Sequence, residues 1–193
     1  MLTELQSIDQ DILIAINALH CPLFDWMMWQ VSGKWQWIPL YSVILFFLYK
    51  RYPGKSFFIL FVLLILMITL SDQIAGIFKF SVARLRPSHE DSLSGLLHFV
   101  NGYQGGKFGF YSAHASNSMA LAVFVSLLLK EKWIWMTLLF WAALVSYSRI
   151  YLGVHFPSDI LAGWLAGAFI AFICYKLFCF VLRSCQRFDF LMK

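Results

Sequence analysis

The residues best suited to chemistry lie between positions 147 and 163, in the run YSRIYLGVHFPSDILAG. This run places an arginine, a histidine and an aspartate between two long apolar segments, where charge facing hydrocarbon would be costly. Asp159 follows His155 by four residues, and Pro157 suits the first turn of a helix. A carboxylate so placed can fix the tautomer of an imidazole, raise its basicity and aim its other nitrogen at a substrate. Charged residues at this position between two apolar segments indicate an active site.

A second cluster, Tyr111-Ser112-Ala113-His114, stands directly before another apolar segment. Ser112 is a good N-cap residue, and a helix N-terminus offers free backbone N–H groups and a partial positive charge to an anion. His114 would then lie in the first turn. Taken alone, this cluster is more simply explained as a capping serine beside an interfacial histidine.

A third group of charges surrounds the end of the long apolar segment before Pro87. Lys79 and Arg86 together could hold a phosphate, because arginine offers a planar fork of donors and lysine a compact charge. Arg84 is expected to bind headgroups or a distal phosphate. Asp72 lies two helical turns before Lys79, and we expect it to brace Lys79 or a neighbouring arginine. The alternative is that these cations are long side chains reaching from a span end to the headgroups.

The three clusters, in this order, resemble the motifs of the type 2 phosphatidic acid phosphatase (PAP2) family. Lys79, six residues and then Arg86-Pro87 fit the first motif, and Ser148-Arg149, five residues, His155, three residues and Asp159 fit the third. The second motif departs from the family, whose usual Pro-Ser-Gly-His is Tyr-Ser-Ala-His here. Alanine lacks the freedom in φ that glycine has, which bears on the loop shape. The resemblance covers residues 72–163.

The resemblance implies metal-independent hydrolysis of a phosphomonoester or pyrophosphate, without a cofactor, through a covalent phosphohistidine. His155 would be the nucleophile, Asp159 its orienting partner and His114 the general acid. The residues implied to hold the phosphoryl oxygens are Lys79, Arg86, Ser112, Arg149 and, through its amide, Ala113.

The composition is that of a membrane protein. The chain has 193 residues, 61% hydrophobic and only 13% charged, which is more apolar surface than a soluble domain of this length can bury. The net charge of +5 comes from residues scattered at segment ends rather than gathered in a stripe, so nucleic acid is not an expected partner. No linker divides the sequence, and we expect one domain over residues 1–193.

Hydropathy predicts an all-α membrane protein with about five transmembrane helices. Residues 2–19 carry apolar side chains at helical spacing opposite acidic ones, which favours an amphipathic helix in the membrane interface, with a sixth span as the alternative. The expected spans are residues 35–49, 56–80, 112–129, 133–151 and 157–181.

Loop charge predicts the sidedness of these spans. Basic residues follow the first, third and fifth spans, so these ends should be cytoplasmic and all three clusters should meet at the outer face. We therefore expect a bacterial cytoplasmic membrane protein whose site faces the periplasm.

A site opened by helices in contact with lipid suits a membrane lipid that carries phosphate. The candidates are undecaprenyl pyrophosphate, lipid A, phosphatidylglycerol phosphate and phosphatidic acid, among which the sequence does not choose. The glycine-rich and aromatic loop 88–110 is expected to contact this lipid or to rest among headgroups. Two alternatives are a transporter lined by Asp72, Lys79 and Arg149, and a catalytically silent protein that binds lipid phosphates.

Overall fold

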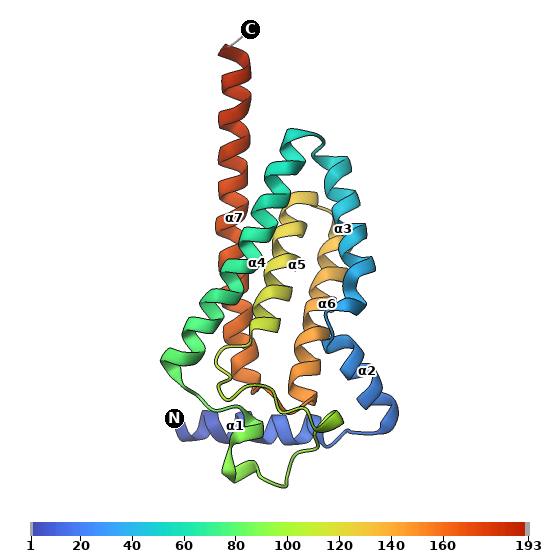
Figure 1. Cartoon of the computed structure of the whole chain (residues 1–193), viewed down its shortest axis with the longest axis vertical. Helices are drawn as coiled ribbons and strands as arrows, with labels where there is room; N and C mark the ends of the chain where they lie inside the picture. The colour runs from blue at the N-terminus through green and yellow to red at the C-terminus, as the bar shows by residue number, and fades with distance from the viewer. Residues whose placement is uncertain (1, 192–193) are drawn as a thin grey trace.

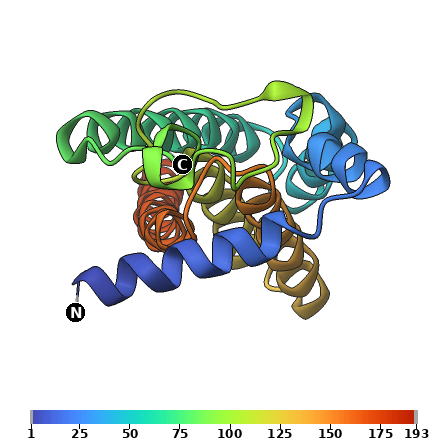
Figure 2. The same ribbon diagram turned by 90° about the horizontal axis from the view of Figure 1, so that it is seen from below.

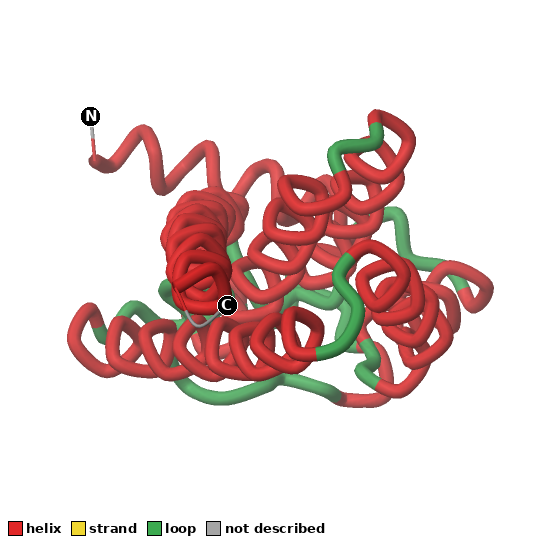
Figure 3. The backbone as a smooth tube through the Cα atoms, turned by 90° about the horizontal axis from the view of Figure 1, so that it is seen from above, coloured by secondary structure: helices red, strands yellow, loops and turns green. Residues whose placement is uncertain are grey.

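The computed structural model describes residues 2–191, with side chains described over residues 4–184. Within these residues the chain forms helices joined by loops and no β-strand (Figure 3), which confirms the predicted fold class. The α-helices are α1 (Leu2–Asn17), α2 (Pro22–Ser32), α3 (Ile38–Arg51), α4 (Lys55–Val82), α5 (Ala113–Leu129), α6 (Lys132–Tyr151) and α7 (Pro157–Leu191). Short 3-10 turns lie at η1 (Trp35–Trp37), η2 (Pro87–His89), η3 (Asp91–Leu93) and η4 (Val100–Gly102).

Helices α3 to α7 form an upright bundle with α5 in its middle (Figure 1). Two glycines let α7 approach α5 closely. A Cβ atom at Gly163 would lie 2.7 Å from the carbonyl oxygen of Ser112, and one at Gly167 would collide with the carbonyl of Ser116. Small residues at such spacing are typical of tightly packed membrane helices. The main apolar core, which includes Leu60, Phe124 and Phe178, lies in the part of the bundle farther from α1.

The five expected spans correspond to α3 through α7. Three of them, α4, α6 and the part of α7 from Pro157 to Ser184, are long and apolar enough to cross a membrane. Helix α5 has 17 residues and α3 has 14, which is short of the roughly 20 that a span needs, although both stand in the same bundle (Figure 1). The turn η1 lengthens α3 at its start.

Helix α1 lies across one end of the bundle (Figures 1 and 2). It bends by 117° into α2, so the two together do not form a straight sixth span. Leu13 on its inner face is fully buried, whereas Leu5 and Ile8 are 57% and 53% exposed on another face. An exposed apolar face on a helix lying across the bundle is the arrangement expected of an interfacial helix.

The basic turns and the motif clusters lie at opposite ends of the bundle. The turn from α3 to α4, with Lys50, Arg51 and Lys55, and the turn from α5 to α6 share the end remote from α1. The end of α4, the start of α5 and the loop between α6 and α7 lie at the α1 end. The alternation that the loop charges predicted is therefore present in the fold.

Candidate active site

The motif clusters meet around one cavity of about 780 Å³, called here the catalytic cavity. Lys79 comes from the last turns of α4, Arg86 from the loop after it, His114 from the first turn of α5, Arg149 from the end of α6 and His155 from the loop before α7. Segments far apart in sequence thus bring two imidazoles and three cations to one space. Such a cluster is suited to binding and transferring a phosphoryl group.

His155 and Asp159 form a buried pair behind the cavity wall. Their side chains are 1% and 0% exposed, and His155 Nδ1 lies 3.3 Å from Asp159 Oδ2. The same oxygen accepts the backbone N–H of Phe156 at 3.1 Å. His155 lines the cavity, so its Nε2 is the nitrogen available to a substrate while the carboxylate holds the other side of the ring.

The second oxygen of Asp159 is held by Arg84. Arg84 Nη1 donates to Asp159 Oδ1 at 2.9 Å, and Nη2 donates to Asp9 Oδ2 at 2.8 Å. The guanidinium also lies 4.2 Å from the ring centroid of Phe156. Arg84 was predicted from sequence to bind headgroups or a distal phosphate, whereas in the structure it forms ion pairs with two carboxylates. The reason is that α4 ends at Val82, before Pro87, with Ala83 in the left-handed region at φ 51°.

Asp9 is a site residue that the sequence analysis missed. Its side chain accepts the backbone N–H of Ser158 at 2.9 Å and also contacts the Ser158 hydroxyl, so α1 is tied to the first turn of α7. The available signal was the position of Asp9 on α1 one turn before Leu13 and two before Asn17, on the face that packs inward. Because polar residues are expected on the solvent-facing side of an amphipathic helix, the sequence did not indicate that Asp9 is buried.

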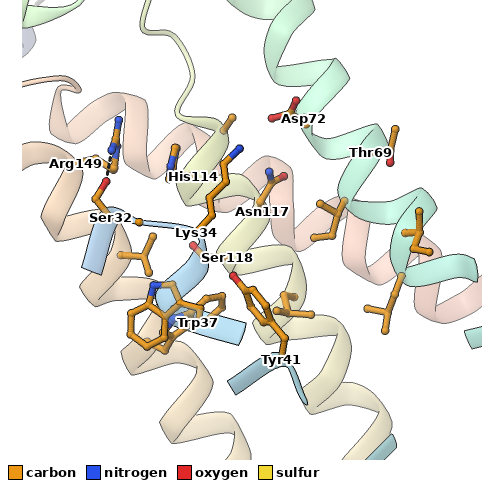
Figure 4. Close-up of a pocket in the computed structure, with 18 of the residues that line it drawn as sticks. Ser32, Lys34, Trp37, Tyr41, Thr69, Asp72, His114, Asn117, Ser118 and Arg149 are labelled. Atoms are coloured by element: carbon orange, nitrogen blue, oxygen red, sulfur yellow. Dashed lines mark hydrogen bonds between the residues drawn. The ribbon is translucent and has the colours of Figure 1, made fainter. Parts of the chain in front are cut away.

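Two arginines at the cavity, Arg149 and Arg86, are held by the end of α2 and by loop 88–110. Arg149 donates to the hydroxyl of Ser32 and, at 3.2 Å, to that of Tyr103, while its Nε is buried without a hydrogen-bond partner among the described residues (Figure 4). Arg86 donates to the carbonyl of Phe108 at 3.2 Å. A Cβ at Gly105, where φ is 70°, would lie 2.6 Å from Arg86, so glycine is required there. Loop 88–110 thus contributes directly to the site through Tyr103.

The second motif forms the start of α5. Ser112 is the N-cap of α5 as predicted, accepting the N–H of Ala115 at 3.5 Å, and it is fully buried. Ala113 is already helical, so the freedom of glycine is not needed at this position. Ala113 and His114 line the cavity, whereas Ser112 lies behind it and its N–H donates to the carbonyl of Asp159 at 3.1 Å.

Asp72 and Lys34 also line the cavity. Asp72 points from α4 into the space beside His114, and Lys34 reaches the same space from the segment after α2 (Figure 4). No hydrogen bond or ion pair of the Asp72 carboxylate occurs within the described residues, so the expected brace of Lys79 is not made by direct contact. Lys34 was missed because a lone lysine in a tryptophan-rich segment carries no motif.

The remote part of the cavity is apolar and extends between α3, α4, α5 and α6. Phe61 and Ile65 of α4 on this wall are also exposed on the outside of the bundle. A molecule with a charged head and a hydrocarbon tail matches this change of lining. The apolar lining residues are Trp37, Tyr41, Ile44, Leu45, Phe61, Leu64, Ile65, Ile68, Leu121, Trp141 and Val145.

Comparison with known proteins identifies relatives of one kind. Residues 60–181 match the model of the PAP2 superfamily. The chain is 39% identical to a lipid A 4'-phosphatase of Bacteroides thetaiotaomicron, over 92% of this chain and 81% of that protein. It is 35% identical to a lipid A 4'-phosphatase of Porphyromonas gingivalis, over 89% and 73%. An undecaprenyl-diphosphatase of Sulfolobus acidocaldarius is 34% identical over 75% of this chain and 64% of that protein.

Two crystal structures share the fold. The PAP2-type phosphatidylglycerolphosphate phosphatase of Bacillus subtilis superposes with a TM-score of 0.70 at 22% identity, covering 90% of this chain and 86% of that one. LpxE of Aquifex aeolicus superposes with a TM-score of 0.68 at 24% identity, covering 86% and 94%. The arrangement of helices described above is therefore that of known membrane phosphatases.

Proposed function

The chain belongs to the PAP2 superfamily, and on this premise we propose that it hydrolyses a phosphate group from a membrane lipid through a phosphohistidine on His155. It is an integral membrane lipid phosphatase, as its relatives are. The observation that carries the catalytic proposal is the buried His155–Asp159 pair at a cavity lined by four cations and a second histidine.

The geometry supports a two-step reaction. His155 Nε2 attacks phosphorus, the bond to the leaving oxygen breaks, and His114 gives that oxygen its proton. Water then attacks the phosphohistidine with His114 as base, which releases inorganic phosphate and restores both imidazoles. Lys79, Arg86 and Arg149 stabilise the charge on the phosphoryl oxygens, with help from the amides at the start of α5.

For the substrate, we propose lipid A bearing a 4'-phosphate as the first choice and undecaprenyl pyrophosphate as the second. Of the three relatives described above, the two matched over the larger share of their own length are lipid A 4'-phosphatases. The apolar part of the catalytic cavity also suits an acyl chain. We also propose that the protein lies in the cytoplasmic membrane with its site facing the periplasm. The reason is that the basic turns lie at the end of the bundle opposite the site.

Phosphate release from purified protein in detergent tests this function. The panel contains lipid A, undecaprenyl pyrophosphate, phosphatidylglycerol phosphate and phosphatidic acid, with EDTA present throughout. We expect release of phosphate from at least one lipid. We also expect inhibition by vanadate, which mimics the transition state of phosphoryl transfer. Ion flux in vesicles with no phosphate release would favour a transporter, and lipid binding without release would favour a silent member of the family.

The pH dependence offers a separate prediction. Burial, together with the charges of Arg86, Arg149 and Lys79, lowers the pKa of His155 well below 6.5, and a hydrogen bond to the backbone of Gly109 only partly opposes this. Only neutral imidazole attacks phosphorus, so kcat/KM falls as pH drops through this pKa, below pH 6.5. Removing a cation raises the pKa of His155, so Arg86→Gln should move this acid limb to higher pH.

The matched control is Arg86→Lys, which keeps the charge. It should lower kcat/KM but leave the acid limb in place, and the titration of the substrate cancels because all three proteins use the same lipid. An acid limb at the same pH in Arg86→Gln and in the unaltered protein would show that His155 is not the group that titrates.

A further inference from the structure

The catalytic cavity contains polar side chains that the mechanism above does not use. Asp72 of α4 and Asn117 of α5 point into the cavity next to His114, and Lys34 reaches in beside them (Figure 4). None of the three belongs to a motif. They lie between the cations that hold phosphate and the apolar part of the cavity, where the middle of a bound lipid would lie.

The role of His114 decides what these side chains can touch. A general acid must contact the leaving oxygen, so the leaving group has to lie against His114 on the side away from His155. Asn117 follows His114 by three residues and therefore lies one turn farther along the same face of α5. Asn117, with Asp72 and Lys34 across the cavity, is therefore placed to contact the leaving group of the substrate.

Two of these groups are hydrogen-bond acceptors without partners. Asn117 Oδ1 is buried and has no hydrogen bond within the described part of the chain, whereas the Asp72 side chain is exposed to the open cavity and forms no hydrogen bond or ion pair with the described residues. Leaving a buried acceptor such as Asn117 Oδ1 unpaired costs free energy, whereas Asp72 faces the open cavity and can accept hydrogen bonds from a ligand there. A ligand that brings hydrogen-bond donors to this place would satisfy both groups.

We propose that Asp72 and Asn117 form a leaving-group subsite for a phosphorylated sugar, accepting hydrogen bonds from its hydroxyl or amide N–H groups. This inference rests on the proposed function and narrows its substrate class to lipid phosphates whose leaving group carries hydroxyl or amide donors, as a phosphorylated sugar does. A diacylglycerol leaving group has no hydroxyl to offer here, and a diphosphate would bring a second negative charge towards Asp72. A site built to bond a donor discriminates against ligands that lack it.

The test compares two substrates in each variant. Asp72→Leu and Asn117→Leu remove the acceptors at similar volume, and kcat/KM is measured with lipid A and with phosphatidic acid. Each variant should lose about 10- to 100-fold on lipid A, the worth of one or two hydrogen bonds, and less than about twofold on phosphatidic acid. The change in the ratio isolates the subsite from the long-range effect of Asp72 on Lys79, which both substrates share.

The control is Asp91→Leu, which removes an exposed carboxylate in η3 outside the cavity and should change neither rate. Equal losses on both lipids, or none on lipid A, would overturn the subsite while the proposed function stands. Hydrolysis of phosphatidic acid but not of lipid A by the unaltered protein would overturn it too. Release from no lipid at all would instead overturn the proposed function.

An independent observation supports a second proposal, about α1. Asp9 is 7% exposed, and it ties both Arg84 and Ser158 to α1, while Arg84 in turn holds Asp159. We infer that Asp9 is a positioning residue that fixes Arg84 against the carboxylate behind His155. Helix α1 thereby completes the site without touching the substrate, since Asp9 does not line the cavity.

Asp9→Asn should reduce kcat about tenfold and leave KM within about twofold, because one charge-assisted hydrogen bond is weakened away from the substrate. Asp9→Glu should recover part of the rate. Asp11→Asn, an exposed change on the same helix, is the matched control and should be silent. A purely structural role for Asp9 would lower the melting temperature but leave the kcat of the folded Asp9→Asn protein unchanged, which would overturn the proposal.

Discussion

His155→Ala is expected to abolish phosphate release, with a loss of at least about 10⁴-fold, the scale seen when a covalent nucleophile is removed. No other described side chain at the cavity has its nitrogen aimed by a buried carboxylate, so nothing there can replace it. In the unaltered protein, brief exposure to lipid labelled with ³²P should leave label on the protein. The quench must be alkaline detergent, since the bond between phosphorus and imidazole nitrogen is labile in acid.

Two controls make this result specific. His89→Ala removes a histidine from η2, outside the cavity, and should retain both full turnover and the label. The melting temperature of His155→Ala in detergent tests whether the protein still folds. Label that persists in folded His155→Ala protein, or turnover within tenfold of the unaltered protein, would assign the nucleophile elsewhere.

The parts of this molecule that follow from local pattern were predictable from sequence. Long apolar segments can satisfy their backbone only as helices within a membrane, so both ends of α4 and α6 and the start of α7 could be placed to within a few residues. Ser112 as an N-cap and Pro157 at the start of α7 follow from chemistry within a single turn. Alternation of basic turns then predicted which ends of these helices would meet.

The support of the site was not predictable, because it joins segments that no local pattern relates. The bond from Arg84 to Asp9 connects residues 75 positions apart, and that from Ser158 to Asp9 spans 149. Lys34 enters the cavity only because α2 packs against α6 and brings the segment that follows it to this space. The sequence also did not show which face of α1 packs inward, since the apolar residues Leu5, Ile8 and Ile12 are exposed whereas Asp9 is buried.

His114→Ala is expected to show a loss that depends on the leaving group. With an alkyl or sugar leaving group, whose oxygen is strongly basic, removing the general acid should slow the first step by about 10²–10⁴-fold. With an aryl phosphate such as p-nitrophenyl phosphate, the leaving oxygen departs without a proton, so formation of the phosphohistidine should be nearly unaffected. Single-turnover rates with the two substrates measure this difference.

The same variant separates the two steps of the reaction. In the proposed mechanism His114 also activates the water that hydrolyses the phosphohistidine, so His114→Ala given an aryl phosphate should release one equivalent of phenolate in a burst and then stall with label on His155. Ser118→Ala, which changes a small polar side chain of the same cavity and helix, should show neither the burst nor the stall. Equal losses with alkyl and aryl substrates would mean that His114 binds the phosphoryl group and does not protonate the leaving oxygen. In that case His114 would not be the group that activates the water in the second step either. The presence or absence of the burst therefore decides between the two roles of His114.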